Sequence, residues 1–248
     1  MRIPPAPRAF VDAYGMELMA IHRGDEEYEI IERDDGYIDV ADGLGTYFAG
    51  FTDWPEIEQE AFGFVRGRVL DVGAGAGRHA LYLQQCGCRV TAIDNSLLAV
   101  QVCHERGLDD ARVVAIEDIA SLQPETFDTI LMLGNNFGLF GNARTARRLL
   151  RTMGKITNAS ARIVAETMDP LKTANPCHLA YHERNRTRGR MPGQVRIRVR
   201  FRDVVGPWIH YLFVGEKELA EILEGTGWEI ERVIRDETPQ YVAVIRRA

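Results

Sequence analysis

Short apolar runs alternate with amphipathic segments through the middle of the chain. Runs rich in Val, Ile and Leu predict five strands, and the segments between them predict three helices. The predicted strands are 69–72, 89–93, 112–116, 127–133 and 161–166, and the predicted helices are 78–85, 96–106 and 142–157. Alternating strands and helices form βαβ units, so residues 66–165 predict a mostly parallel sheet.

The same kind of pattern returns near the C-terminus. Residues 216–224 are amphipathic and stop at Gly225 and Gly227, which predicts a helix with a glycine end. Two strands follow at 229–234 and 241–245, and the short turn at Pro239 implies that they are antiparallel. We therefore expect an α/β fold with a seven-stranded, mostly parallel sheet, an antiparallel last strand and helices on both faces.

Two segments interrupt this plan. Residues 1–65 hold a Pro-rich start, a predicted helix at 9–21 and a hairpin pattern at 29–40 whose turn is Asp35–Gly36, so we expect an N-terminal cap. Residues 169–214 hold an alternating strand over 195–202 and a partner strand at 209–214, joined through Gly206–Pro207. We expect an antiparallel β insertion at 169–214 within a domain that spans 66–248.

The composition is that of a globular protein with a substantial core, since 46% of the 248 residues are hydrophobic and 27% are charged. No stretch approaches the ~18 apolar residues that cross a bilayer, and the start lacks the apolar region of a signal peptide, which favours the cytoplasm. The cysteines form only one C-x-C pair, which predicts buried free thiols and no metal site; they are Cys86, Cys88, Cys103 and Cys177.

The net charge of -6 combines two opposed segments. Nine acids and one arginine lie between residues 25 and 42, whereas eight arginines and no acid lie between residues 184 and 202. Four of these arginines alternate with apolar residues and form what we call the arginine ladder: Arg196, Arg198, Arg200 and Arg202. The ladder admits three interpretations: a solvated strand face, pairing with the acidic hairpin within one chain or across a homodimer, or binding of an anionic acceptor or an RNA backbone.

A glycine-rich loop follows the first predicted strand in the sequence VLDVGAGAGRH. Glycines allow a ligand to approach the backbone closely. Dinucleotide enzymes use G-x-G-x-x-G to place a pyrophosphate at a helix N-terminus, but here Arg78 stands where the third glycine would follow Gly73 and Gly75. This spacing disfavours a pyrophosphate ligand and, with it, a nicotinamide-dependent oxidoreductase.

Polar groups follow the next three strands. Asp94 ends the second strand, where its carboxylate suits both hydroxyls of a ribose. Asp118 follows the third strand, where it suits an adenine amino group, and Ile119 beside it offers a backbone N–H and an apolar wall. The fourth strand ends in residues 133–136, whose carbonyls suit a cationic ligand end. These segments should meet at the carboxyl edge of the sheet and predict a ligand that contains adenosine.

This series resembles the class I, Rossmann-like, S-adenosylmethionine-dependent methyltransferase superfamily. VLDVGAGAG is similar to its first motif, VTAIDNS to its second, AIEDIA to its third and FDTILMLGNN to its fourth. The resemblance covers residues 66–166 by motif and 216–247 by topology. It implies S-adenosyl-L-methionine as cofactor and a methyltransferase activity.

The resemblance also implies cofactor contacts. Gly73, Ala74 and Gly75 would line the methionine moiety, Asp94 and Asn95 the ribose, Asp118 and Ile119 the adenine, and Leu133, Gly134 and Asn135 the amino-acid end. Asp71 would order the glycine loop, or, as a strand-end acid, only cap local N–H groups.

The acceptor side carries weaker signals. Methyltransferases that modify exocyclic nucleic-acid amines or protein glutamine carry a (D/N/S)PP(Y/F) tetrapeptide at the fourth strand, whereas residues 134–137 of this chain read GNNF. This departure resembles the small-molecule branch, in which a cap and a late insertion form the acceptor pocket. Candidates for that pocket are Tyr37, Tyr47, Phe48, Trp54, Glu166, His178, Tyr181 and His182, and each of them has an alternative role in packing.

Candidate catalytic groups are Glu166, His178 and His182. The two histidines are four residues apart and would share one face of a helix, so a base, a metal pair and plain surface packing are all open for them. The cofactor is already activated, and a dedicated base is optional.

The leading hypothesis is methyl transfer to an O, N or C atom of a small molecule, without a membrane or nucleic-acid partner. An RNA methyltransferase that uses the arginine ladder and a non-catalytic module that only binds the cofactor are the alternatives. RNA binding that weakens steeply with salt would favour the first alternative, and cofactor binding without turnover would favour the second.

Overall fold

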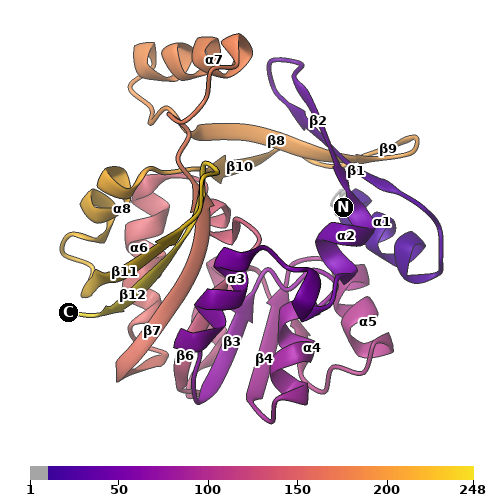
Figure 1. The fold of residues 1–248 in the computed structure, drawn as a ribbon, viewed down its shortest axis with the longest axis vertical. Coiled ribbons are helices and arrows are strands. Elements are labelled where there is room, and N and C mark those ends of the chain that lie inside the picture. The colour runs from indigo at the N-terminus through magenta and orange to yellow at the C-terminus, as the bar shows by residue number, and fades with distance from the viewer. Residues whose placement is uncertain (1–10) are drawn as a thin grey trace, which may run out of the picture.

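The computed structural model describes residues 11–248, which fold around two β-sheets (Figure 1). The larger sheet has seven strands in the order β11-β12-β7-β6-β3-β4-β5. Its strands are β3 (Arg68–Val72), β4 (Arg89–Asp94), β5 (Ala111–Val113), β6 (Phe127–Met132), β7 (Thr157–Met168), β11 (Trp228–Arg235) and β12 (Gln240–Arg247). Strands β3 to β7 are parallel, and β12 runs antiparallel to both β7 and β11, which confirms the predicted fold class.

Helices cover both faces of this sheet. Successive residues of β3 point to opposite sides, so Leu70 packs in one cluster with α6 (Ala143–Met153) and α8 (Glu216–Leu223), and Val69 packs in another with α3 (Glu56–Ala61) and α4 (Arg78–Gln85). Helix α5 (Leu97–Glu105) covers β4 on the side of α4. The near-continuous apolar runs in the sequence follow from this burial on two faces.

The smaller sheet joins the two segments that interrupt the sequence pattern. Its path is β10-β8-β1-β2, with β9 also paired to β8. The strands are β1 (Tyr28–Arg33), β2 (Ile38–Asp42), β8 (Gln194–Phe201), β9 (Val204–Val205) and β10 (Ile209–Leu212). Strand β1 pairs with β8 across 164 to 170 residues of chain, in the register Ile31↔Val199, so the predicted cap and the predicted insertion form one antiparallel sheet.

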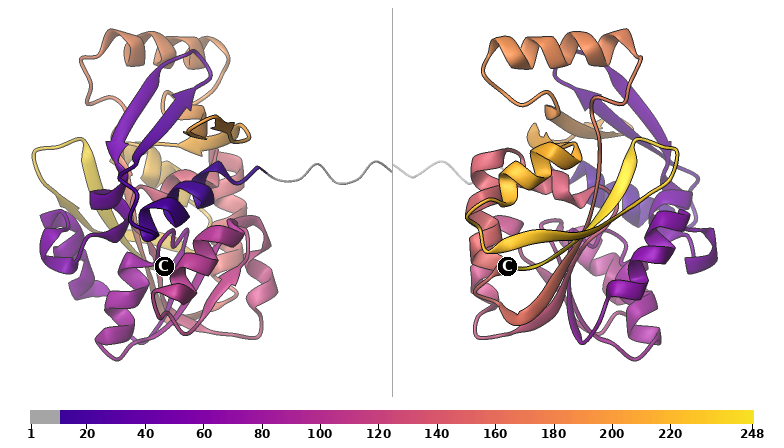
Figure 2. Two further views of the ribbon diagram at one scale, coloured as in Figure 1. Left: turned by 90° about the vertical axis from the view of Figure 1, so that its right-hand side faces the viewer. Right: turned by 60° about the vertical axis from the view of Figure 1, so that its left-hand side comes forward.

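Short helices connect these sheets. Helices α1 (Ala13–His22) and α2 (Gly43–Phe48) flank the β1–β2 hairpin, and α7 (Pro176–Thr187) lies at the far end of the molecule from α4 and α5 in both figures (Figure 1, Figure 2). The 3-10 helices are η1 (Phe51–Asp53), η2 (Phe62–Phe64), η3 (Ile116–Leu122) and η4 (Asn136–Phe140). No helix within residues 11–248 has the length and apolar character needed to span a bilayer.

Several predicted boundaries differ from the structure. The third strand was expected over 112–116 but ends at Val113, because η3 begins at Ile116. The helix expected over 142–157 ends at Met153, since the chain turns at Gly154 and starts β7 at Thr157, four residues before the predicted start. The helix expected over 9–21 runs over Ala13–His22, and its first two predicted residues lie outside the described part.

Two expectations about side-chain burial were wrong. Only Cys103 is a buried free thiol, since Cys86 and Cys177 are exposed and Cys88 is half-buried. The apolar face of β8 is not uniformly buried either: Val195 and Phe201 at its ends are buried, and the residues between them are half-buried.

Candidate active site

The carboxyl ends of β3, β4 and β6 meet below the smaller sheet (Figure 1). The glycine loop leaves β3 with positive φ angles of 75° at Gly73, 57° at Gly75 and 78° at Gly77, a backbone that side chains with a Cβ rarely adopt. The backbone N–H of Gly75 donates to Oδ2 of Asp94 over 3.0 Å. Two segments predicted to bind one ligand are therefore joined by a direct hydrogen bond.

Asp94 is held by the backbone on both sides. Its Oδ1 accepts from the N–H of Ser96 over 2.9 Å, while its Oδ2 faces the glycine loop. Ser96 also caps α5, because its hydroxyl accepts from the N–H of Ala99. Burial raises the pKa of Asp94, and each carboxylate oxygen keeps a lone pair for a further donor.

Asp71 lies at the end of β3, where 1% of its surface is exposed. Burial, followed by the negative charge of Asp94, raises its pKa to about 7. Its Oδ2 has no hydrogen-bond partner among the described residues, and the same is true of Oδ1 of Asn135 in the loop after β6. Buried acceptors without donors are costly, and a ligand with N–H groups would satisfy them.

The loop after β6 is tied to the glycine loop. Gly134 and Asn135 both have positive φ, and the side-chain amide of Asn136 donates to the carbonyls of Val72, over 3.0 Å, and Gly73, over 2.8 Å. The loop also receives support from the smaller sheet, since the hydroxyl of Tyr211 on β10 donates to the Asn135 carbonyl over 2.7 Å.

The residues predicted to face the base and the ribose differ in exposure. Asp118 and Asn95 are exposed, and Ile119 is fully buried in the main core cluster. Asp118 and Ile119 follow β5 and lie in η3. The side chain of Ile119 packs in the core and thereby fixes η3. A ligand can therefore contact the backbone of Ile119 but not its side chain.

Glu166 belongs to a buried charged cluster on the opposite side of the loop. One of its oxygens accepts from the N–H of Gly134 over 2.6 Å. Burial, followed by the charge of Glu58 on α3, raises the pKa of Glu166 to about 8. Glu58 in turn accepts from Arg78 over 2.6 Å and contacts His79 at 3.1 Å. Glu166 therefore supports the loop that follows β6.

The two histidines of α7 are not brought to this edge. His178 packs edge-on against Tyr37, with ring centroids 4.9 Å apart, and contacts Thr173. His182 is 5% exposed, and its Nδ1 has no partner within the described residues. Tyr181 donates to Asp34 and so ties α7 to the β1–β2 turn, far from the glycine loop.

Three aromatic residues of the N-terminal segment, Tyr47, Phe48 and Trp54, have different neighbours. Tyr47 lies above the glycine loop, whereas Trp54 is buried at 4% exposure and packs edge-on to His79, with centroids 4.7 Å apart. Phe48 stacks on His22. Trp54 therefore has the packing role that the sequence allowed as its alternative.

The arginine ladder lies against the acidic hairpin of the same chain. Glu32 on β1 accepts two hydrogen bonds from Arg198, at 2.9 and 2.8 Å, and one from Arg200 at 2.6 Å. Arg202 pairs with Asp25 and Glu27, while Arg196 stacks over Trp208. Of the three interpretations of the ladder, pairing within one chain accounts for most of its charge.

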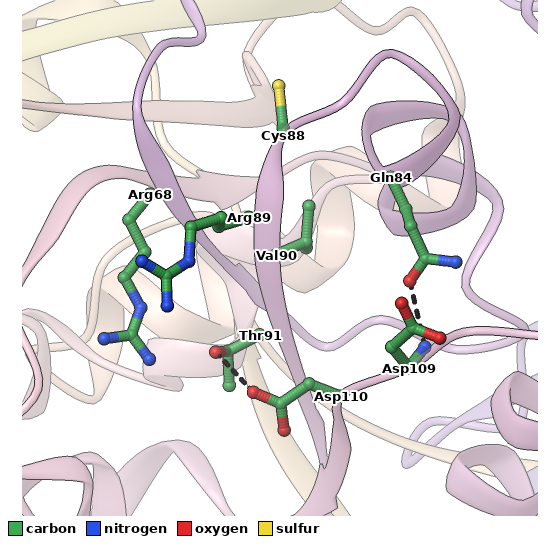
Figure 3. Close-up of a pocket in the computed structure, with 8 residues that line it drawn as sticks. All are labelled: Arg68, Gln84, Cys88, Arg89, Val90, Thr91, Asp109 and Asp110. Carbon is green, nitrogen blue, oxygen red and sulfur yellow. Dashed lines mark hydrogen bonds between the residues drawn. The ribbon is translucent and has the colours of Figure 1, made fainter.

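A shallow pocket of about 260 Å³ lies at the other edge of the sheet (Figure 3). Arg68 and Arg89 begin β3 and β4 there, and Thr91 donates to Asp110 at its floor. Ligands of open parallel sheets bind at the carboxyl ends of the strands. This pocket is at the amino ends and is separate from the candidate site.

Several residues at this edge were not predicted from the sequence. They are Asp12, Tyr14, Glu17, Glu29, Glu58 and Tyr211. Asp12 is the N-cap of α1 and also accepts a hydrogen bond from the Ser96 hydroxyl over 2.7 Å. It therefore fixes α1 to the segment that follows β4. The available signal was an acid among apolar neighbours, as for Glu17 in GMELMA.

Sequence comparison places the methyltransferase match on the same segment. The model of a family described as a methyltransferase domain matches residues 69–159. A ubiquinone biosynthesis O-methyltransferase of Xanthomonas oryzae is 36% identical over 97 residues, which are 36% of this chain and 41% of that protein. One from Xanthomonas euvesicatoria is 41% identical over 68 residues, 25% of this chain and 28% of that protein. The chain thus spans less than half the length of these curated relatives.

Solved structures extend the likeness in fold to most of the chain. A SAM-dependent methyltransferase from Bacteroides fragilis, in complex with S-adenosyl-L-homocysteine, aligns with a TM-score of 0.80 at 24% identity over 96% of this chain and 95% of that one. An amino pentose methyltransferase from Micromonospora echinaspora aligns with a TM-score of 0.57 at 15% identity over 82% of this chain and 94% of that one. Residues 69–159 thus match a methyltransferase domain family, and the chain as a whole has the Rossmann-like α/β fold of the aligned methyltransferase structures.

Proposed function

We propose that the chain binds S-adenosyl-L-methionine at the carboxyl edge of the larger sheet and transfers its methyl group to a small molecule. The contact that carries this proposal is the hydrogen bond from Gly75 N–H to Asp94, because it joins the glycine loop to the acid that would hold a ribose. Two ends of one adenosyl ligand are thereby kept at a fixed separation before the ligand binds.

The residues at this edge suit that cofactor. The unpartnered buried oxygens of Asp71 and Asn135 would accept from its ammonium group, and both oxygens of Asp94 retain acceptor capacity for two ribose hydroxyls. The absence of a side chain at Gly73 lets the loop after β6 come close, since a Cβ there would lie 2.8 Å from the Asn136 side-chain nitrogen. A metal is not required by this donor set.

When bound, the cofactor supplies an activated methyl group on a sulfonium. The chain's own contribution is to bind, orient and exclude water. Asp94 fixes the ribose, the Gly134–Asn135 turn fixes the amino-acid end, and Glu166 holds that turn by accepting from Gly134 N–H. With its pKa raised to about 8, Glu166 is largely protonated at neutral pH and acts as a positioning group.

A small-molecule acceptor is supported by the layer above the site. We assign residues 1–65 as a cap and 169–214 as an insertion in a methyltransferase domain that spans 66–248; the described parts of both segments contribute to the smaller sheet. The amino pentose methyltransferase and the ubiquinone biosynthesis relatives act on small molecules by their names. The internal pairing of the arginine ladder removes most of the charge that an RNA methyltransferase would need.

The test is cofactor affinity in an Asp94→Ala variant. We expect micromolar binding of S-adenosylmethionine by calorimetry and a loss of about two orders of magnitude, because two hydrogen bonds to a charged acceptor contribute about 1.5 kcal/mol or more each. Asp94→Asn keeps one oxygen acceptor and should fall between the two. The matched control is Asp109→Ala, which removes an exposed acid at the opposite edge. Unchanged affinity in Asp94→Ala would remove the basis of the proposal.

A further inference from the structure

Three side chains from separate segments meet beside the glycine loop, and a fourth contacts the loop after β6; we call the four the tyrosine–glutamate box: Tyr14 on α1, Glu29 on β1, Tyr47 on α2 and Tyr211 on β10. The rings of Tyr14 and Tyr47 pack edge-on with centroids 5.5 Å apart. The Tyr47 hydroxyl donates to Oε1 of Glu29 over 2.5 Å. Burial, followed by the charges of Asp94 and Glu29, raises the pKa of Tyr14, and burial, followed by the charge of Glu29, raises that of Tyr211.

The box spans the two loops assigned to the cofactor. A Cβ placed on Gly75 would lie 2.6 Å from the Tyr14 hydroxyl oxygen and 3.5 Å from the Tyr47 ring. On the other side, Tyr211 donates to the carbonyl of Asn135. A group held in the box is therefore placed between the glycine loop and the loop after β6, where an acceptor has to meet the methyl group.

Two buried acids, Glu29 and Glu17, belong to the box and its surroundings. Glu29 is 8% exposed, and its one described hydrogen bond comes from Tyr47. Glu17 behind it is 0% exposed, and neither of its oxygens has a partner within residues 11–248. Burial, then Glu29 and Glu27, raises the pKa of Glu17 to about 8, and burial raises that of Glu29. The strongest charged neighbours of this pair are acids, so a cation would offset the cost of burying it.

We propose that the acceptor is an amine, which binds as its ammonium ion between the faces of the three tyrosines and the Glu29 carboxylate. This inference rests on the proposed methyltransferase function and names the acceptor class of the same site. Tyrosine rings attract cations through their electron-rich faces, and a carboxylate within the box adds a charged hydrogen bond. An alcohol of the same shape has neither attraction and would leave Glu29 uncompensated.

The same group can accept the proton that has to leave before transfer. The ammonium N–H proton passes to the Glu29 carboxylate, which frees the nitrogen lone pair. The nitrogen forms a bond to the methyl carbon while the carbon–sulfur bond breaks and its electron pair stays on sulfur. The products are a methylated ammonium ion and S-adenosylhomocysteine, and Glu29 then releases one proton to solvent.

The experiment uses the full chain saturated with S-adenosylhomocysteine, and benzylamine and benzyl alcohol as matched probes. Binding is followed by ligand-observed NMR. We expect benzylamine to bind at least about tenfold more tightly than benzyl alcohol, and the Glu29→Gln variant to lose that preference. Gln keeps an oxygen that accepts from Tyr47. Glu26→Gln, which neutralises an exposed acid three residues away, should leave the preference intact.

The outcomes distinguish failure of the amine proposal from failure of the proposed methyltransferase function. Cofactor affinity is measured in the same samples: if Glu29→Gln binds S-adenosylhomocysteine like the parent chain and loses only the amine, the box is an acceptor site. A preference for benzyl alcohol, equal binding of the two probes, or no binding of benzylamine to the cofactor-loaded chain overturns the amine proposal while leaving the cofactor site in place. Loss of S-adenosylhomocysteine binding in Glu29→Gln assigns Glu29 to the cofactor and also overturns it.

Discussion

Replacing Glu166 by Gln should change how the stability of the fold depends on pH. Glu166 accepts from Gly134 N–H and faces Glu58, which is itself held by Arg78 and His79. Burial and the Glu58 charge raise its pKa from 4.5 to about 8. Gln has the shape of the protonated acid and can make the same contacts, so the substitution removes the titration and keeps the packing.

The sign and size follow from proton linkage. In the unfolded chain Glu166 loses its proton near pH 4.5, whereas in the folded chain it keeps it to about pH 8. Its contribution to stability is therefore complete below pH 4.5 and is lost as the pH rises through about 8. The slope is about 1.4 kcal/mol per pH unit, which gives about 2.5 kcal/mol between about pH 5.5 and about pH 7.5.

The assay is urea unfolding of both proteins at these two pH values. We expect the stability of Glu166→Gln relative to the parent chain to increase by about 2.5 kcal/mol from the lower to the higher pH. Glu60→Gln removes an exposed acid from the same α3 segment and is the control. Parallel pH profiles for the parent and Glu166→Gln would refute the assignment of Glu166 as a buried, protonated group.

Two further predictions concern the smaller sheet. In Gly138→Ala, the new methyl would lie 1.9 Å from the Tyr211 ring, so β10 and η4 should move apart and the free energy of unfolding, measured with urea, should fall by about 1–3 kcal/mol. The control is Gly63→Ala, which meets no atom within 4 Å and should be close to neutral. Equal losses in the two variants would contradict the clash. In Glu32→Gln, Arg198 and Arg200 lose their shared carboxylate partner, so the affinity for heparin at low salt should rise. The slope of log affinity against log salt concentration should steepen by up to about 2. No change in affinity or slope would show that the arginine ladder is already free.

Local sequence was sufficient for most of the larger sheet. The run 69–72 followed by three glycines predicts a buried strand, a tight loop and a helix, and the structure has β3 and α4 there. Burial on both faces makes the strands apolar throughout, and capping residues such as Ser96 start the helices, so each element carries its own signal. The third strand was the exception, because a three-residue strand followed by a 3-10 helix has no period long enough to identify.

The sequence also predicted where the cofactor site lies, because the glycine loop, Asp94 and the loop after β6 each follow their own strand and parallel strands bring their carboxyl ends together. Only the tertiary structure decided the rest. Strand β1 pairs with β8 across more than 160 residues, and neither strand encodes its partner in its own pattern. That pairing places Glu32 beside Arg198 and Arg200 and brings β1, which carries Glu29, into the smaller sheet, while His178 and His182 stay remote from the glycine loop. Contacts between distant segments depend on packing free energy summed over the whole fold, which no local window of sequence contains.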